Sequence, residues 1–308
     1  MASVDSFNAY TTIGAYLIGV LVSYLLLGVA TSQAYGYYHR FPTDSLQLKF
    51  LVGFVWLCSV AHVVLNGHAL FVFMISDLTH PDRIFDQPTP KSFETVFLFY
   101  GLIAACVQGF FSYRIYAFSK KLHIPILIWI LVFVHLLSCT GSFAMGLRAP
   151  SLPAYQAETD WLAIVGWTVG ATCDVLITVT LVILLYRQRT TVTRRSTLAQ
   201  LDKLILWSLE TGLMTSITAT LALICFIAMK RNFLYLTFFA IEPQVVVNSL
   251  LATLNSREAL RAMNECEVDL TIPMAFTEKS MHKETDTVVS DKEDQSETSH
   301  TRSTDSPV

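Results

Sequence analysis

Two apolar runs, residues 204–229 and 232–255, constrain the fold more than any other feature of the sequence. Each run exceeds the roughly 20 residues that a helix needs to cross a bilayer, and only two basic residues separate them. The pattern predicts a hairpin of two transmembrane helices. Because hydrocarbon does not solvate carboxylates such as Glu210 and Glu242, other helices must surround this hairpin.

Five further apolar runs upstream can supply those neighbours. The complete set is 12–37, 50–76, 95–113, 122–147, 161–186, 204–229 and 232–255. With 53% hydrophobic and 15% charged residues among 308, the chain is too apolar for an ordinary soluble domain. We therefore predict an all-α fold, a polytopic bundle of seven transmembrane helices.

The two ends of the chain differ from this membrane domain. The first run follows a segment without basic residues and is longer than the apolar part of a cleaved signal peptide. We therefore expect an extracytoplasmic N-terminus over 1–11 and a membrane domain over 12–255. Residues 256–308 hold 12 of the 24 acidic residues and are rich in Ser and Thr. Such a segment cannot bury enough apolar surface to fold, so we expect a disordered cytoplasmic tail.

The distribution of Lys and Arg predicts the orientation. One side of the predicted bundle holds Arg40, Lys49, Arg114, Lys120, Lys121, Arg187, Arg189, Arg194, Arg195, Lys203, Arg257 and Arg261, and the other holds Arg83, Lys91, Arg148, Lys230 and Arg231. This bias predicts an outer N-terminus and a cytoplasmic C-terminus, in either the plasma membrane or an endomembrane. The two longest outer connections, 77–94 and 148–160, contain several prolines, and we expect them to be irregular.

Ionisable side chains within the spans are the candidate functional residues. Counting 1.5 Å per residue from the span ends puts His62, His135, Asp174 and Glu242 at about one level. Glu210 lies nearer the cytoplasm, and Asn66, Gln108, Gln244 and Asn248 add uncharged polar groups. Since buried carboxylates are costly in a bilayer, we predict a midplane pocket for a small polar ligand, a cation or protons. The alternative is that each group is satisfied by structural hydrogen bonds.

Small residues predict how some helices pack. Gly166, Gly170 and Asp174 follow one another at four-residue spacing, so they share a helix face that another helix can approach closely. Gly212 and Ser216 repeat the pattern in the next run. This arrangement predicts that Asp174 faces the bundle interior.

Several chemistries have no matching pattern. No span contains a Lys for a retinal Schiff base, and the Asp-Arg-Tyr and Asn-Pro-x-x-Tyr signatures are missing. A zinc hydrolase needs about three ligating side chains, and only His62 and His135 lie deep. We predict a protein that is not an enzyme and needs no cofactor, with an intramembrane zinc hydrolase as the alternative.

The polar segments suggest contacts outside the bilayer. The basic connection 187–203 and the acidic tail are candidate contact surfaces for a cytoplasmic partner, and nothing indicates nucleic-acid binding. Ser290 precedes a run of charged residues that an acid-directed kinase could recognise, and Cys266 is a candidate for palmitoylation.

Several stretches resemble a known family. They are Gly28, Gln33, Tyr37, Phe41, Pro42, Asp44, Lys49, Trp56 and His62 near the start; Gln108, Phe110, Phe111, Arg114 and Ile115; Asp174, Ile177, Thr178, Arg195, Ser196 and Leu201; Glu210 to Leu213, Thr215 and Ser216; and Asn248 to Asn255 with Arg257. This set resembles the fungal, basidiomycete-type seven-span membrane proteins whose C-terminal half, about 171–258 here, is a domain of unknown function (DUF6534). The resemblance implies a seven-helix fold and fungal origin, but no activity.

These observations lead to one function hypothesis and two alternatives. The hypothesis is a receptor-like or sensory protein in the lipid bilayer whose midplane pocket responds to a small-molecule ligand. The first alternative is a proton- or cation-coupled transporter that uses Asp174 and Glu242. The second is a non-catalytic membrane scaffold.

Overall fold

The computed structural model describes residues 9–79, 89–191, 195–228 and 234–257, all but a few of which are helical. The helices are α1 (Ala9–Arg40), α2 (Leu46–Thr79), α3 (Lys91–Ser119), α4 (His123–Gly146), α5 (Leu152–Thr191), α6 (Arg195–Ala228) and a last helix, Leu234–Arg257, called the seventh helix here. Each contains a segment long and apolar enough to cross a membrane, which confirms the predicted all-α, seven-span fold.

The helices extend beyond the apolar runs that predicted them. The connection 148–160 was expected to be irregular, but α5 begins at Leu152, so that expectation was wrong over most of its length. Pro153 lies in the first turn of α5, where a helix donates no internal hydrogen bond from its backbone N–H groups, so the proline costs little there. Of the other proline-rich connection, residues 80–88 lie outside the described residues.

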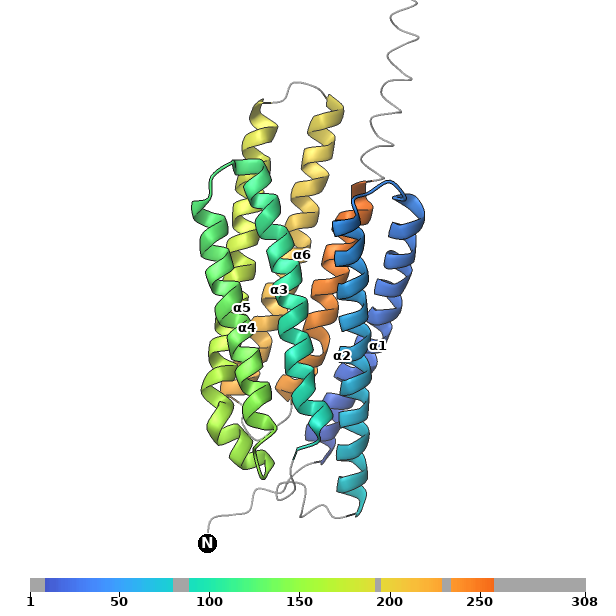
Figure 1. Ribbon diagram of the computed structural model, residues 1–308, viewed down its shortest axis with the longest axis vertical. Helices are drawn as coiled ribbons and strands as arrows, with labels where there is room; N and C mark the ends of the chain where they lie inside the picture. Colours follow the sequence, from blue (N-terminus) through green and yellow to red (C-terminus); the bar gives the residue numbers. More distant parts are fainter. Residues whose placement is uncertain (1–8, 80–88, 192–194, 229–233, 258–308) are drawn as a thin grey trace, which may run out of the picture. The chain divides into compact units, whose positions relative to one another are not determined.

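Helices adjacent in the chain pack side by side, as Figure 1 shows for α1 with α2 and for α3 with α4. The seventh helix occupies the interior of the bundle. Of its most apolar stretch, 72% of the residues are buried, compared with 56% for α3 and 33% for α1. The seventh helix and α3 therefore form the centre against which the other five helices pack.

One end of the bundle carries the basic residues and is called the basic end below. It is formed by the end of α1, α3, α5 and the seventh helix and by the beginning of α2, α4 and α6. The end of α5 and the beginning of α6 project beyond the other helices there (Figure 1). The side of the membrane that this end faces remains a prediction.

Polar side chains of the seventh helix bond to the backbone of α1 at three levels. The Thr237 hydroxyl donates to the Ala15 oxygen at 2.7 Å, the Asn248 amide to the Leu26 oxygen at 3.0 Å, and the Asn255 amide to the Gln33 oxygen at 2.9 Å. In each pair the two residues are 222 positions apart, so the helices run parallel in one register. These three bonds are called the α1 ladder here.

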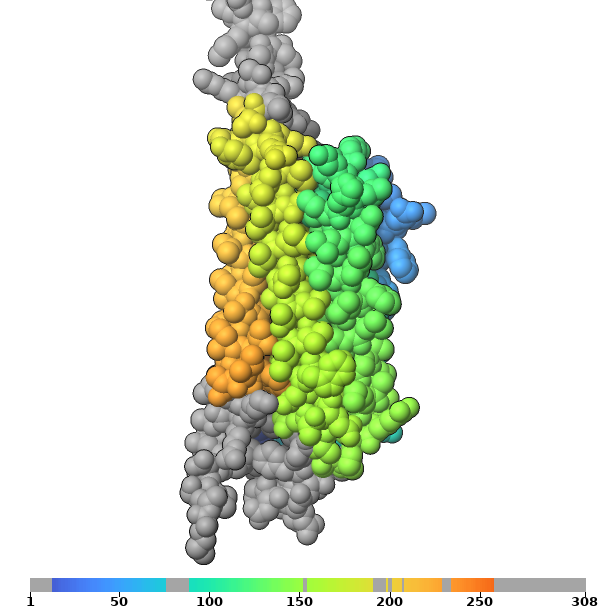
Figure 2. Space-filling view, turned by 90° about the vertical axis from the view of Figure 1, so that its left-hand side faces the viewer, coloured from blue at the N-terminus to red at the C-terminus, as the bar shows by residue number. Residues whose placement is uncertain are grey.

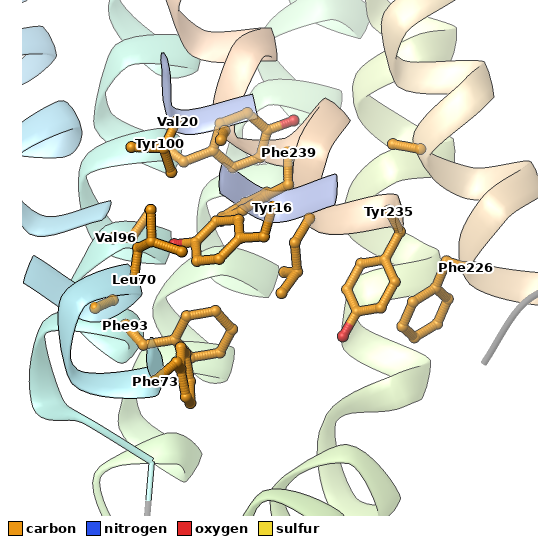
Figure 3. Close-up of a cluster of buried hydrophobic side chains, with 14 of the residues drawn as sticks. Tyr16, Val20, Leu70, Phe73, Phe93, Val96, Tyr100, Phe226, Tyr235 and Phe239 are labelled. Atoms are coloured by element: carbon orange, nitrogen blue, oxygen red, sulfur yellow. The ribbon is translucent and has the colours of Figure 1, made fainter. Parts of the chain in front are cut away.

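Aromatic side chains fill the half of the bundle away from the basic end (Figure 3). The Phe239 ring of the seventh helix stacks on Phe97 with 4.6 Å between ring centroids and meets Tyr100 edge-on at 5.4 Å. Trp167 of α5 lies 6.0 Å from Tyr235. Because aromatic pairs at these distances attract one another beyond their buried area, the cluster fixes the seventh helix against α3 and α5.

At the basic end, an ion pair attaches the last turn of the seventh helix to the α1–α2 connection. Arg257 lies 2.5 Å from a carboxylate oxygen of Asp44, which also accepts a hydrogen bond from the Tyr37 hydroxyl at 3.0 Å. The Arg257 guanidinium stands 4.5 Å above the Phe41 ring. Since the Asp44 side chain is only 14% exposed, the pair is shielded from water more than a surface pair is.

Replacing Gly19 by Ala should separate α1 from the seventh helix. A Cβ at this position would lie 2.6 Å from the Thr237 Cα, a backbone atom that cannot move aside. We expect Gly19→Ala to destabilise the purified protein by about 1–3 kcal/mol, the usual cost of overpacking. Gly28→Ala on the same helix is the control, since nothing lies within 4 Å of its added Cβ. Equal thermal unfolding temperatures in detergent would contradict the close approach.

Replacing Asp44 by Asn should loosen the end of the seventh helix. The substitution removes the charge that holds Arg257, and we expect a loss of roughly 1–3 kcal/mol, the value for hydrogen bonds to charged groups. The matched control is Asp202→Asn, because the Arg189–Asp202 pair at 2.6 Å has side chains that are 43% and 51% exposed. Hydrogen exchange of residues 250–257 should accelerate in Asp44→Asn but not in Asp202→Asn.

Candidate functional site

A small cavity with both polar and apolar lining residues lies beside Asp174, between α3, α5, α6 and the seventh helix. The Gln108 amide of α3 donates to the Asp174 carboxylate at 2.9 Å. The cavity has a volume of about 30 Å³ and is called the Asp174 cavity here. Its polar lining consists of Gln108, Asp174, Thr178, Ser208, Thr211, Thr215 and Ser249.

Oxygen atoms dominate the polar wall of the Asp174 cavity. The Thr178 hydroxyl donates its proton to the Asp174 backbone oxygen at 2.8 Å, so its own oxygen remains an acceptor. The Thr215 hydroxyl donates to the Gly212 backbone oxygen at 3.2 Å. Gln108 is 5% exposed, and its Oε1 has no hydrogen-bond partner among the described residues. A buried acceptor of this kind is costly unless water or a cation meets it.

Glu242 and His135 form a second polar group beside the cavity. Tyr100 of α3 interacts electrostatically with Glu242, and its ring is 5.2 Å from that of His135. Glu242 interacts electrostatically with Asp174. In the described part of the chain, Glu242 Oε2 and His135 Nε2 have no hydrogen-bond partner. Three of the four ionisable residues predicted at one level are thus brought together by two side chains of α3.

His62 belongs to a different set of contacts. The Asn66 amide donates to the His62 backbone oxygen at 2.9 Å, and the Tyr16 hydroxyl donates to the Asn66 side-chain oxygen at 2.8 Å. The ring of Phe239, 6.2 Å from that of His62, lies next to Tyr100. Asn66 therefore joins α1 to α2, and His62 packs beside Phe239; neither residue lines the Asp174 cavity.

The remaining predicted pocket residues also lie elsewhere. Glu210 is on an exposed part of α6 and does not line the Asp174 cavity. Asn248 belongs to the α1 ladder. Gln244 accepts a hydrogen bond from the Ser59 hydroxyl of α2 at 2.6 Å, which fixes another face of the seventh helix.

The small residues lie at close helix contacts. A Cβ added to Gly170 would lie 3.2 Å from the His135 ring, and one added to Gly166 would lie 3.2 Å from the Ser138 hydroxyl. Gly212 of α6 has no room for a Cβ, because the Thr178 side chain of α5 fills that space. Ser216, one turn later, is half-buried. The glycines on α5 thus admit His135, while Gly212 brings α6 to the cavity wall.

A third buried carboxyl was not predicted. Glu94 is 1% exposed, accepts a hydrogen bond from the Thr89 hydroxyl, and interacts with the hydroxyl of Tyr155. Its side chain also fills the space beside Gly146. Pro90 could have indicated the position of Glu94 from the sequence. It lies just before α3 and so places Glu94 in the first turn, where the helix dipole favours a carboxylate.

In the described ranges, no group of three or more His, Cys, Asp or Glu side chains lies together in a way that could hold a metal ion. Five cysteines there are free thiols. The two candidate modification sites, Cys266 and Ser290, lie outside the described residues, as does the tail.

Comparison with known proteins gives one match. Residues 170–259 match the model of a family of unknown function, DUF6534. No curated protein and no solved structure matches the chain significantly. The matched segment contains Asp174, the α6 wall of the Asp174 cavity and the whole seventh helix. The chain is therefore a polytopic membrane protein of unknown function, with the DUF6534 match over its last three spans.

Proposed function

We propose that the protein is a receptor-like membrane sensor whose stimulus is a proton or a small monovalent cation bound in the Asp174 cavity. One observation carries this proposal. The Asp174 carboxylate and the unpartnered Gln108 oxygen share a cavity with several hydroxyl groups. Oxygen ligands of this kind suit hard cations and hydrated protons.

The size of the cavity supports a small occupant. Its volume of about 30 Å³ is far below the several hundred cubic ångströms of a typical pocket for an organic ligand. A space of this size accommodates about two water molecules, or one dehydrated ion with a water.

The position of the cavity supports sensing. Thr211, Gly212 and Thr215 of α6 form one wall, whereas Gln108 and Asp174 form the facing wall. A bound cation attracts oxygen atoms from both walls, so its binding favours the arrangement in which α6 is close to α3 and α5. We propose that this change reaches a cytoplasmic partner through the projecting ends of α5 and α6 and the acidic tail. The segment predicted as the connection, 187–203, is rich in basic residues, and most of it belongs to these two helices.

A second candidate function is proton- or cation-coupled transport. The observation favouring it is the series of polar groups from Asp174 through Glu242 and Tyr100 to His135. A second cavity of about 20 Å³ is also lined in part by Tyr100, Ser138 and Ser142. Such a series could pass protons between the two halves of the bundle.

A non-catalytic scaffold is the third candidate, since every group described above also contributes to packing. We propose no catalytic role for any residue. The intramembrane zinc hydrolase considered from the sequence would require bound zinc, which elemental analysis of the purified protein would detect.

Replacing Asp174 by Asn should abolish the response to sodium. We expect residues 204–220 of the purified full-length chain in nanodiscs to exchange hydrogen more slowly in sodium chloride than in choline chloride. The expected ratio is roughly tenfold when sodium is at ten times its dissociation constant. Repeating the comparison between pH 5 and pH 8 in choline chloride tests the proton as the stimulus.

The matched control is Glu210→Gln, which neutralises an exposed carboxyl of α6 outside the cavity. This variant should retain the full response. If Asp174→Asn unfolds at a lower temperature but keeps the response, Asp174 has only a structural role and the scaffold is favoured.

Vesicle flux separates the sensor from the carrier. Phosphatidylcholine vesicles containing the protein and an internal pH-sensitive dye should acidify no faster than empty vesicles when an outward potassium gradient drives proton entry. Acidification that disappears in both Asp174→Asn and Glu242→Gln, but persists in Glu210→Gln, would establish the carrier instead.

A further inference from the structure

A large groove separate from the Asp174 cavity lies near the basic end. It has a volume of about 500 Å³ and is lined by the turn between α3 and α4 and by the end of α5. Figure 2 shows the face on which α4 and α5 lie side by side. This space is called the α3–α5 groove here.

The polar side of the α3–α5 groove is positively charged. Lys121, His123 and Arg187 line it, and none of its ten lining residues is acidic. Arg114 adds a further positive charge nearby, since its guanidinium lies 5.6 Å from the ring centroid of Phe118, which also lines the groove. Arg189 differs from these residues because it is paired with Asp202.

The backbone of the turn between α3 and α4 places Lys121 and His123 beside the groove. Lys120 has a φ of 54°, a left-handed conformation that is unusual for a residue other than glycine, and it ends α3. The chain reverses there, and α4 starts at His123 without a side-chain cap on its first turn. The first N–H groups of α4 therefore add to the positive potential that the side chains create.

The other side of the α3–α5 groove is apolar and continues along the bundle. Ile124 and Ile183 line the groove and are 39% and 48% exposed. Further exposed apolar residues follow them along the same two helices, Leu127 on α4 and Val179 on α5. In a chain that spans a bilayer, such surfaces contact acyl chains.

We propose that the α3–α5 groove binds the phosphorylated headgroup of an anionic membrane lipid. The charged groups of Lys121 and Arg187 and the imidazole of His123 contact the headgroup phosphate, and the acyl chains lie along Ile124 and Ile183. A soluble phosphate compound would use only the charged side of the groove. The lipid uses both sides, and basic pockets between spanning helices are a recurring kind of site for such headgroups.

The test uses the purified full-length chain in phosphatidylcholine nanodiscs. Short-chain phosphatidylinositol 4-phosphate is added, and the unfolding temperature is followed as a function of its concentration. We expect a saturable stabilisation. Lys121→Gln and Arg187→Gln should each weaken the apparent affinity about fivefold, and the double variant by roughly thirtyfold.

The matched control is Lys203→Gln, which removes the same charge from an exposed position at the basic end outside the groove. Its affinity should equal that of the unaltered protein. Equal affinities for the double variant and the unaltered protein would overturn the proposal. So would an equal stabilisation by inorganic phosphate or by inositol 1,4-bisphosphate without acyl chains.

Photo-crosslinking identifies the occupant directly. A benzophenone amino acid replaces Ile183, and Phe50 at the basic end, which is 73% exposed and outside the groove, is the control position. In vesicles with one part phosphatidylinositol 4-phosphate to nine parts phosphatidylcholine, adducts at Ile183 should be enriched in the phosphorylated lipid relative to Phe50. Adducts with residues 258–308 would show that the acidic tail occupies the groove, and equal lipid ratios would show no selectivity. Either result would overturn the proposal.

Discussion

The need to satisfy polar groups away from water determines much of this bundle. The seventh helix is the most buried span and also carries Glu242, Gln244, Asn248 and Asn255. In a bilayer, a polar side chain without a protein partner is costly. The helix therefore has to be surrounded, and its amides and hydroxyls bond to α1 and α2 while Glu242 meets α3. An outer position for this helix would expose the same groups to lipid.

The sequence predicted the number and class of helices because an apolar run of bilayer length directly indicates a membrane-spanning helix. It predicted the helix ends less well, since α5 begins at Leu152 with polar and proline residues in its first turns. An apolar run does not include such turns, because they lengthen a spanning helix without being hydrophobic. The central place of the seventh helix could have been inferred from its polar residues, which have no use on a lipid-facing surface.

The candidate site was only partly predictable. Depth along a helix follows from counting residues, which predicts one level for Asp174, Glu242 and His135. The direction of each side chain around the bundle axis depends on which helices are neighbours, and a single amino-acid sequence does not contain that information. His62 illustrates the difference: counting gives it the same depth, but it lies beside Asn66 of its own helix and Phe239 of the aromatic cluster. The sequence identifies Gln108 only as a polar residue within a span, whereas the structure shows that its amide donates a hydrogen bond to Asp174.

The α1 ladder has a consequence for how the protein is made. α1 leaves the ribosome before the seventh helix, to which it bonds at three levels in a constant register. Until the seventh helix is inserted, Gly19 and the neighbouring surface of α1 remain without their closest contact. These seven helices therefore cannot reach their native packing while only α1 to α6 have been translated. Chains that stop before residue 234 expose this seam to lipid, which makes them natural targets for membrane quality control.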